Sequence, residues 1–143
     1  MSNRKIKEKS ETLIIDLPEI DYTSTENRAI LRWKYMWEDI LIYFYGRTWH
    51  PCAYLKVHEM PIEIEMMDVP CNWWITFHNE ITEDDSVAEW NGWRFTPWLW
   101  IGWDYAHCDD YMRILGRWKK WTTKEILKEM EDVILYCKQR WIL

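Results

Sequence analysis

The chain has 143 residues, of which 48% are hydrophobic and 29% charged, with four glycines and five prolines. This length suits one domain, and the composition excludes a chain that is disordered throughout. The formal net charge of −6 argues against general nucleic-acid binding, because phosphate contacts require a basic surface. No apolar run approaches the roughly 20 residues of a membrane span, and no signal peptide follows the basic start. We therefore expect a cytoplasmic protein without a membrane partner.

The four cysteines are widely spaced, and the thirteen tryptophans are unusually many. Cys52, Cys71, Cys108 and Cys137 form no CxxC pair, so we expect reduced thiols rather than a zinc site or a disulfide framework. Aromatic side chains suit both a dense small core and a stacking surface for a ligand. Core packing accounts for most of the tryptophans, which leaves a few as candidates for a binding site.

The first predicted elements are a flexible basic arm over residues 1–10 and a short strand over residues 12–16. Thr23-Ser24-Thr25-Glu26 has the spacing of a capping box, which predicts a helix that begins near Thr25. Apolar residues then recur at spacings of three and four, and Gly46 is the expected end of this helix. These apolar positions are Ile30, Trp33, Met36, Trp37, Ile40, Leu41 and Phe44.

From Cys52 onward, short runs rich in β-branched and aromatic residues alternate with turn residues, which predicts a mainly antiparallel sheet. The predicted strands cover residues 53–58, 62–66, 72–78, 90–95 and 98–103, with an acidic loop over 80–89. A second capping box at Thr122 predicts a helix with one apolar stripe that runs nearly to the C-terminus. We therefore expect a single α+β domain over residues 11–143, with a twisted sheet flanked by an N-terminal and a C-terminal helix.

Polar side chains concentrate at the point where the predicted strand over residues 98–103 ends. Asp104, His107 and Asp110 follow this strand, and a helical turn would place them on one face. These residue types can bind a divalent metal or perform acid–base chemistry. The other interpretation is that Asp104 caps a turn and His107 is a hydrogen-bonded structural histidine. Cys108 is a poor catalytic partner for His107, because sequence neighbours rarely point the same way.

The stretch Trp100–His107, followed by Asp110, resembles the W-W-I-G-F-D-C-A-H-x-G-D signature of a family of small uncharacterised phage and prophage proteins. An upstream family strand, H-G-G-L-T-F, is similar in place to Asn72–Phe77, and the closing helix of the family is similar to Lys124–Gln139. The resemblance covers roughly the C-terminal half of the chain. Its specific part is Gly102–His107.

The chain departs from this family pattern at positions that bear on catalysis. Asn72, Trp73 and Trp74 stand where the family has His-Gly-Gly, and Tyr105 stands where it has Cys. If the family residues serve catalysis, this protein has lost it, and two tryptophans fill space that two glycines would leave open. The resemblance therefore implies a binding protein rather than an enzyme, in a phage setting where small proteins counter host defence.

The leading hypothesis is a non-enzymatic protein that sequesters a small ligand, such as a nucleotide immune signal, in an aromatic pocket without a cofactor or a metal. Aromatic rings would stack on a base at about 1–3 kcal/mol per base. Arginines would neutralise phosphates, or the basic residues are a solvated surface before the last helix. The candidate ligand-binding residues are Asn72, Trp73, Trp93, Arg94, Trp98, Trp103, Asp104, Tyr105, His107, Arg113 and Arg117, with Lys119 and Lys120 as further cations.

Two alternatives stay open from the sequence. One is a protein–protein inhibitor of a host defence enzyme, which would use the acidic residues 83–85 and an exposed aromatic patch. The other is a metal-dependent phosphoester hydrolase, in which Asp104, His107 and Asp110 would bind the metal. His50 or His58 would then act as the base. A homodimer is also favoured, because two helices of this length cannot cover both faces of the sheet.

Overall fold

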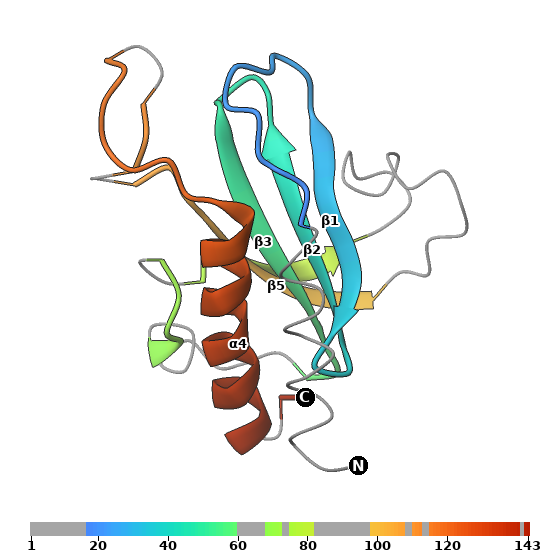
Figure 1. Cartoon of the computed structure of the whole chain (residues 1–143). Helices are drawn as coiled ribbons and strands as arrows, with labels where there is room; N and C mark the ends of the chain where they lie inside the picture. The colour runs from blue at the N-terminus through green and yellow to red at the C-terminus, as the bar shows by residue number, and fades with distance from the viewer. Residues whose placement is uncertain are drawn as a thin grey trace.

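A computed structural model describes residues 17–59, 68–72, 75–81, 98–107, 110–112, 115–140 and 142–143. Within these residues, five strands form one antiparallel sheet in the order β1-β2-β3-β5-β4, and one helix packs against it (Figure 1). The elements are β1 (Arg28–Tyr35), β2 (Glu38–Tyr45), β3 (His50–Val57), β4 (Phe77–Ile81), β5 (Trp98–Asp104) and α4 (Thr123–Gln139). The last strand in the sequence thus lies inside the sheet, between β3 and β4.

The region predicted as an N-terminal helix is a β-hairpin of β1 and β2. The chain reverses at Met36 and Trp37, whose φ angles of 51° and 71° are those of a hairpin turn. On either side of this turn, the apolar residues also fit the period of two that is typical of a strand. The many β-branched and aromatic side chains favour strands over a helix. The expected capping box is a local turn instead, in which the Thr23 amide donates to Asp21 Oδ1 at 2.9 Å. The predicted helix from Thr25 to Gly46 is therefore not present.

Gly46 follows β2 and serves a close approach of two backbone segments rather than a helix end. A Cβ atom at this position would collide with the backbone of Thr25 and Glu26. The Gly46 amide also donates to Asn27 Oδ1 at 2.8 Å. The segment that precedes β1 is held against the end of β2 in this way.

The helix α4 covers one face of the sheet, as Figure 1 shows. Its predicted capping box is confirmed, because Thr122 Oγ1 accepts from the Glu125 amide and Glu125 Oε1 accepts from the Thr122 amide at 3.0 Å. Burial of each aliphatic side chain contributes roughly 1.5–3 kcal/mol. The fully buried helix residues are Ile126, Leu127, Met130, Val133, Ile134 and Cys137, and they share a core with Ile42, Leu55 and Ile101 of the sheet.

A second apolar cluster lies on the opposite face of the sheet, which we call the second face. Alternate residues of a strand point to opposite faces, so the strands that bury one set against α4 present another set here. The buried members are Ala29, Leu41, Tyr43, Cys52, Tyr54 and Trp100, with Tyr45 and Phe77 packed beside them. The sheet therefore has two distinct apolar surfaces, and only one of them belongs to the helix core.

The strands predicted over residues 53–58 and 98–103 are confirmed as β3 and β5, but β4 begins later than predicted, at Phe77. The predicted strands over 12–16, 62–66 and 90–95 lie outside the described residues, as do the basic arm and most of the acidic loop. Cys52, Cys71 and Cys137 are free thiols, whereas Cys108 is not among the described residues. Among the described residues, no helix has the length and apolar character needed to cross a membrane.

Candidate functional site

The end of β5 and the start of β3 lie side by side. Cys52 is the partner of Asp104 in the strand register, and the Tyr105 amide donates to the Pro51 carbonyl at 3.1 Å. His50 therefore lies next to the segment that follows β5. Strand alternation places His50, Cys52 and Asp104 on the second face of the sheet, away from α4.

Gly102 allows a tyrosine ring to lie across β5. Its strand partner is Tyr54, and a Cβ atom on Gly102 would stand only 2.7 Å from Tyr54 Cδ1. The Tyr54 hydroxyl lies 2.6 Å from the Tyr45 hydroxyl, and the Tyr45 ring centre lies 5.8 Å from that of His50. Two phenols and an imidazole thus form a row along the second face, ending beside Asp104.

Asp104 and His107 form a partly exposed pair at the end of this row. His107 Nε2 lies 2.9 Å from Asp104 Oδ1, and the side chains are 23% and 25% exposed, respectively. The Thr76 hydroxyl donates to Asp104 Oδ2 at 3.2 Å, and the Ala106 amide approaches Asp104 Oδ1 at 3.3 Å. Asp104 and His107 were predicted to share one face of a helical turn; the structure has no helix here, and a bend of the chain brings the two side chains into contact. We call Tyr45, His50, Tyr54, Thr76, Asp104 and His107 the strand-end cluster.

Burial determines the protonation of two further groups in this region. It lowers the pKa of His50, which opposes a positive charge on this imidazole despite the favourable effect of nearby Asp104. It raises the pKa of the Cys52 thiol, and the Asp104 charge adds to that effect. A protonated, fully buried thiol is a poor nucleophile, so Cys52 belongs to the packing of the second face.

Asp110 has a different environment, although it lies only six residues beyond Asp104. It is 4% exposed, and its carboxylate accepts hydrogen bonds from Asn72 Nδ2 at 2.7 Å, the His107 amide at 2.9 Å and Trp121 Nε1 at 2.9 Å. N–H donors on both oxygens are incompatible with a cation in the same place. Within the described residues, no group of three or more His, Cys, Asp or Glu side chains is arranged to hold a metal. The predicted alternative with Asp110 as a metal ligand has no support from this geometry.

Glu129 of α4 is a second carboxylate of this region that accepts hydrogen bonds from the protein. Glu129 Oε1 accepts from the Asn72 amide at 2.6 Å and from the Tyr105 hydroxyl at 2.9 Å. That hydroxyl in turn accepts from Trp103 Nε1 at 2.8 Å. Burial raises the pKa of Glu129, although these hydrogen bonds oppose the shift. This network joins β5, α4 and the segment before β4.

The structure brings together only part of the predicted ligand set. Asn72, Asp104 and His107 lie close together, since Asn72 Nδ2 also reaches the Asp104 carbonyl at 3.2 Å. Trp103 and Tyr105 are 1% and 2% exposed, so their rings lie in the core with no face toward solvent. Arg117 is exposed and lies on the loop between β5 and α4. Trp73, Trp93, Arg94 and Arg113 lie outside the described residues, and only the backbone of Trp98 is described.

Sequence reasoning missed three members of the strand-end cluster. Tyr45 was assigned near the end of a helix, which hid its pairing with the start of β3. Tyr54 and Thr76 come from separate strand regions and join the cluster only through strand register. A glycine within a strand indicates a close contact, so Gly102 was the available signal for an aromatic partner such as Tyr54.

Comparison with known proteins adds no relative: no protein-family model matches the chain, and neither does a curated protein or a solved structure. The resemblance to the phage signature therefore stays a prediction.

Proposed function

We propose that this protein is a non-enzymatic binding protein that holds a small polar ligand at the strand-end cluster. A nucleotide is the first candidate, because the cluster combines flat rings with a carboxylate that accepts from ribose hydroxyls or base amines. The setting that we propose is the one implied by the phage resemblance, namely sequestration of a nucleotide immune signal in the cytoplasm of the host cell.

The observation that carries this proposal is the partial exposure of the Asp104–His107 pair. The buried Asp110 carboxylate is held by protein donors, whereas Asp104 keeps a quarter of its side chain accessible. An accessible charged acceptor exchanges partners at a lower cost than a buried one, because solvent already satisfies part of it. Asp104 is therefore the carboxylate of this region that is suited to a ligand.

The chemistry of the neighbouring groups favours binding over turnover. Cys52 is protonated and buried, so it does not supply a thiolate. Asp110 presents its lone pairs to N–H groups rather than to a metal. We take the half-buried rings of Tyr45 and His50, whose centres lie 5.8 Å apart, as the aromatic surface against which a flat ligand stacks.

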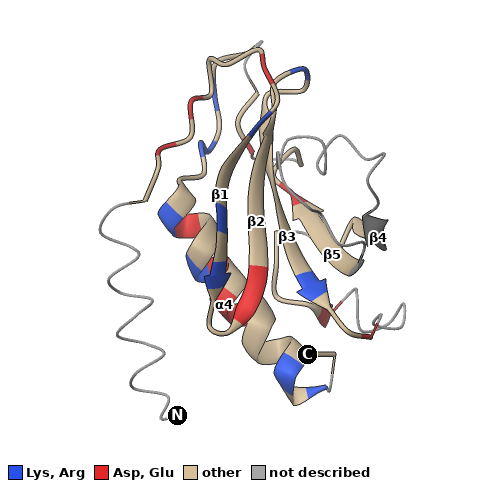
Figure 2. Ribbon diagram, turned by 90° about the vertical axis from the view of Figure 1, so that its right-hand side faces the viewer, with Lys and Arg blue, Asp and Glu red and all other residues tan. Residues whose placement is uncertain are grey.

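Ligand addition to purified protein tests this proposal. A panel of adenosine and guanosine nucleotides should include a compound that raises the melting temperature and is recovered intact, because a ligand that binds only the folded state stabilises it. Asp104→Asn should abolish the shift. Asp39→Asn is the matched control, because Asp39 is a partly exposed carboxylate near the start of β2, 3.6 Å from Lys56 Nζ. Figure 2 shows acidic residues at the start of β2 and a basic residue near the end of β3.

Native mass spectrometry of freshly purified protein gives an independent reading of the same proposal. A retained small molecule in the wild-type spectrum, absent from that of Asp104→Asn, would support the strand-end cluster as its site. A melting temperature that no nucleotide changes, together with a spectrum of the bare chain, would refute the proposal. The same spectrum reports the number of subunits, and thereby tests the expected homodimer.

A further inference from the structure

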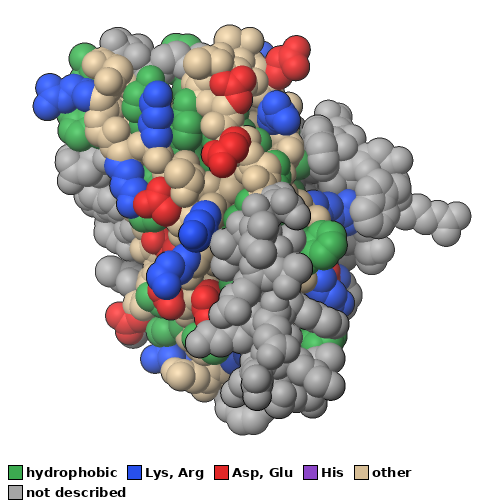
Figure 3. Space-filling view, viewed as in Figure 1, with side chains coloured by type: hydrophobic (Ala, Val, Ile, Leu, Met, Phe, Trp, Pro, Cys, Tyr) green, Lys and Arg blue, Asp and Glu red, His purple; other side chains and the backbone are tan. Residues whose placement is uncertain are grey.

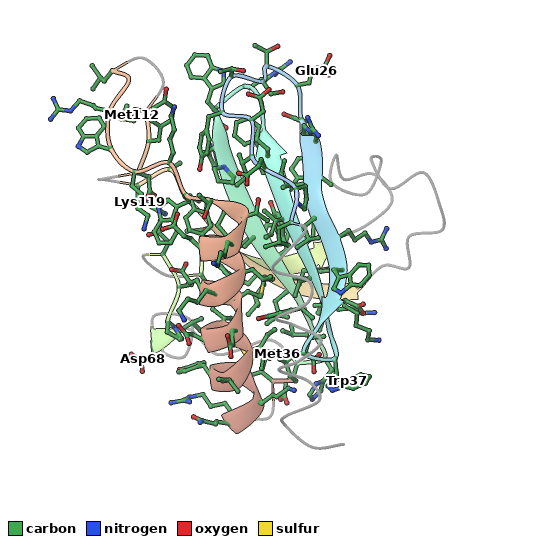
Figure 4. All side chains as sticks on the ribbon, in the orientation of Figure 1. Glu26, Met36, Trp37, Asp68, Met112 and Lys119 are labelled. Carbon is green, nitrogen blue, oxygen red and sulfur yellow. The ribbon has the colours of Figure 1, made fainter. Side chains whose placement is uncertain are left out.

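A loop over residues 110–121 projects from the domain between β5 and α4, and we call it the projecting loop (Figure 1). Its described residues are 110–112 and 115–121. The two sides of the loop are joined by backbone hydrogen bonds from Tyr111 to Lys119 at 2.9 Å and from Met112 to Arg117 at 3.2 Å. Figure 4 shows Met112 on the part of the loop that stands away from the sheet, with Trp37 at the far end of the molecule.

Large apolar side chains are exposed on the outer part of this loop. Met112 is 48% exposed, Leu115 55% and Trp118 39%. Scattered single apolar residues are normal on a protein surface, but a group of large ones on one short protrusion indicates an interaction site. A protruding apolar tip fits a concave partner rather than a small molecule, since a small ligand needs a concave site on the protein itself.

Basic residues occur along the same loop. Residues 111–121 contain two arginines and two lysines and no acidic residue, in a chain whose net charge is −6. The Arg117 guanidinium lies 4.6 Å from the centre of the Trp118 ring, and Lys120 Nζ lies 4.6 Å from that of Tyr111. Figure 3 shows basic and hydrophobic side chains together at the upper left, where the loop extends. The loop is thus a local basic and apolar surface on an acidic protein.

Hydrogen bonds fix both ends of the projecting loop to the domain. Asp110 Oδ1 accepts from Trp121 Nε1 at 2.9 Å, which joins its first residue to its last. The Tyr22 hydroxyl donates to the Trp121 carbonyl at 2.6 Å, and the Tyr22 ring packs edge-on against Tyr111 with centres 5.4 Å apart. A loop whose base is already ordered loses less conformational entropy on binding, which favours affinity.

We propose that the projecting loop docks into a partner protein whose surface carries an apolar pocket with an acidic rim. Leu115 and Trp118 enter the pocket, and Arg117 and Lys120 face the acidic rim. Trp, Tyr and Arg are the residue types that dominate binding energy at protein interfaces, and all three occur here. The overall charge of −6 opposes an anionic membrane or a nucleic acid, which would meet the rest of the protein as well as the loop.

Photo-crosslinking tests this docking. A benzophenone amino acid replaces Leu115 in the full chain, expressed in cells of its natural source, and the same substitution at Leu135 is the control. Leu135 is comparably exposed, at 46%, but it lies on α4. The partner crosslinked from position 115 and not from position 135 is identified, purified and titrated against the unmodified protein.

The titration decides the outcome. Leu115→Glu and Arg117→Glu should each weaken the partner by about tenfold or more, whereas Leu135→Glu should stay within about twofold of the wild-type affinity. Equal weakening by the Leu135 control, or no weakening by either loop variant, overturns the proposal. The protein is also tested for binding to vesicles that contain phosphatidylglycerol and to a single-stranded oligonucleotide. If it binds either one and Leu115→Glu abolishes that binding, the proposal of a protein partner is overturned. Circular dichroism confirms that each variant is folded.

Discussion

Asp104 and Asp110 are six residues apart, yet they belong to regions with opposite character. Asp110 is buried and accepts from three N–H donors that come from three separate segments. Asp104 is a quarter exposed and is held by His107 and Thr76 at the end of the second face. The chain thus uses one carboxylate to fix its architecture and leaves the other accessible.

The position relative to the strand end, rather than the residue type, therefore decides the role of each carboxylate. Asp104 is the last residue of β5 and keeps the alternation of the strand, so it points to the second face. Asp110 follows the turn and returns toward α4, where Asn72 and Trp121 enclose it. A polar residue at a strand end is available to a ligand only if its face of the sheet reaches solvent.

The largest effect that we predict is the loss of stability in Asp110→Ala. This change removes the carboxylate that accepts from the part-buried donors of Asn72, His107 and Trp121, which should lower the free energy of unfolding by about 3–5 kcal/mol. Urea denaturation measures the change. A loss below about 1 kcal/mol, the typical cost of one exposed interaction, would show that the two carboxylates do not differ as described.

Gly102→Ala should give the next largest loss. The added Cβ atom would stand 2.7 Å from the Tyr54 ring, and overpacking of this kind costs about 1–3 kcal/mol. The same urea experiment measures it. Tyr54→Ala in the Gly102→Ala background should recover part of the loss relative to the two single changes, because it removes the clash. Simple additivity of the two changes would argue against this close contact.

The sequence predicted the C-terminal half of this architecture better than the N-terminal half. The capping box at Thr122 and the apolar stripe of α4 depend on local spacing, which a sequence displays directly. The hairpin of β1 and β2 was mistaken for a helix, because its apolar residues satisfy a spacing of three and four across the turn at Met36 and Trp37. The pairing of β1 with β2 distinguishes the hairpin from a helix. The periodicity of the sequence carries no information about that pairing.

The candidate site was predicted in part for the same reason. Asp104 and His107 are close in sequence, so their contact followed from spacing alone. Tyr45 and Thr76 reach them only through strand register, which the sequence did not supply. Trp103 was a candidate stacking residue because of its type, but strand alternation turns it into the core.

Glu129→Gln should produce a smaller, pH-dependent effect. Burial raises the pKa of Glu129 from 4.5, so the folded protein binds this proton more tightly than the unfolded chain does. The stability linked to protonation is therefore present below pH 4.5 and is lost as pH rises through the folded pKa. Glutamine keeps the acceptor oxygen for Asn72 and Tyr105 without the charge. The variant should gain stability relative to the wild type between pH 4.5 and neutral pH, and parallel urea profiles of the two proteins would contradict this.

The smallest change in stability should come from Asp104→Ala. The Asp104 side chain is a quarter exposed, so we expect a loss of no more than about 1 kcal/mol, as for other partly exposed polar contacts. Urea denaturation beside Asp110→Ala makes the comparison direct. A loss equal to that of Asp110→Ala would assign both carboxylates to the architecture and remove the reason to place a ligand at Asp104.

Nuclear magnetic resonance of the His50 and His107 imidazoles is the sharpest test of whether the strand-end cluster binds a ligand. Both sets of signals should shift and saturate on addition of the binding nucleotide, and Asp104→Asn should abolish the shifts while Asp39→Asn preserves them. Imidazole signals that stay in place with every nucleotide, or shifts that persist unchanged in Asp104→Asn, would contradict the assignment of this cluster as the binding site.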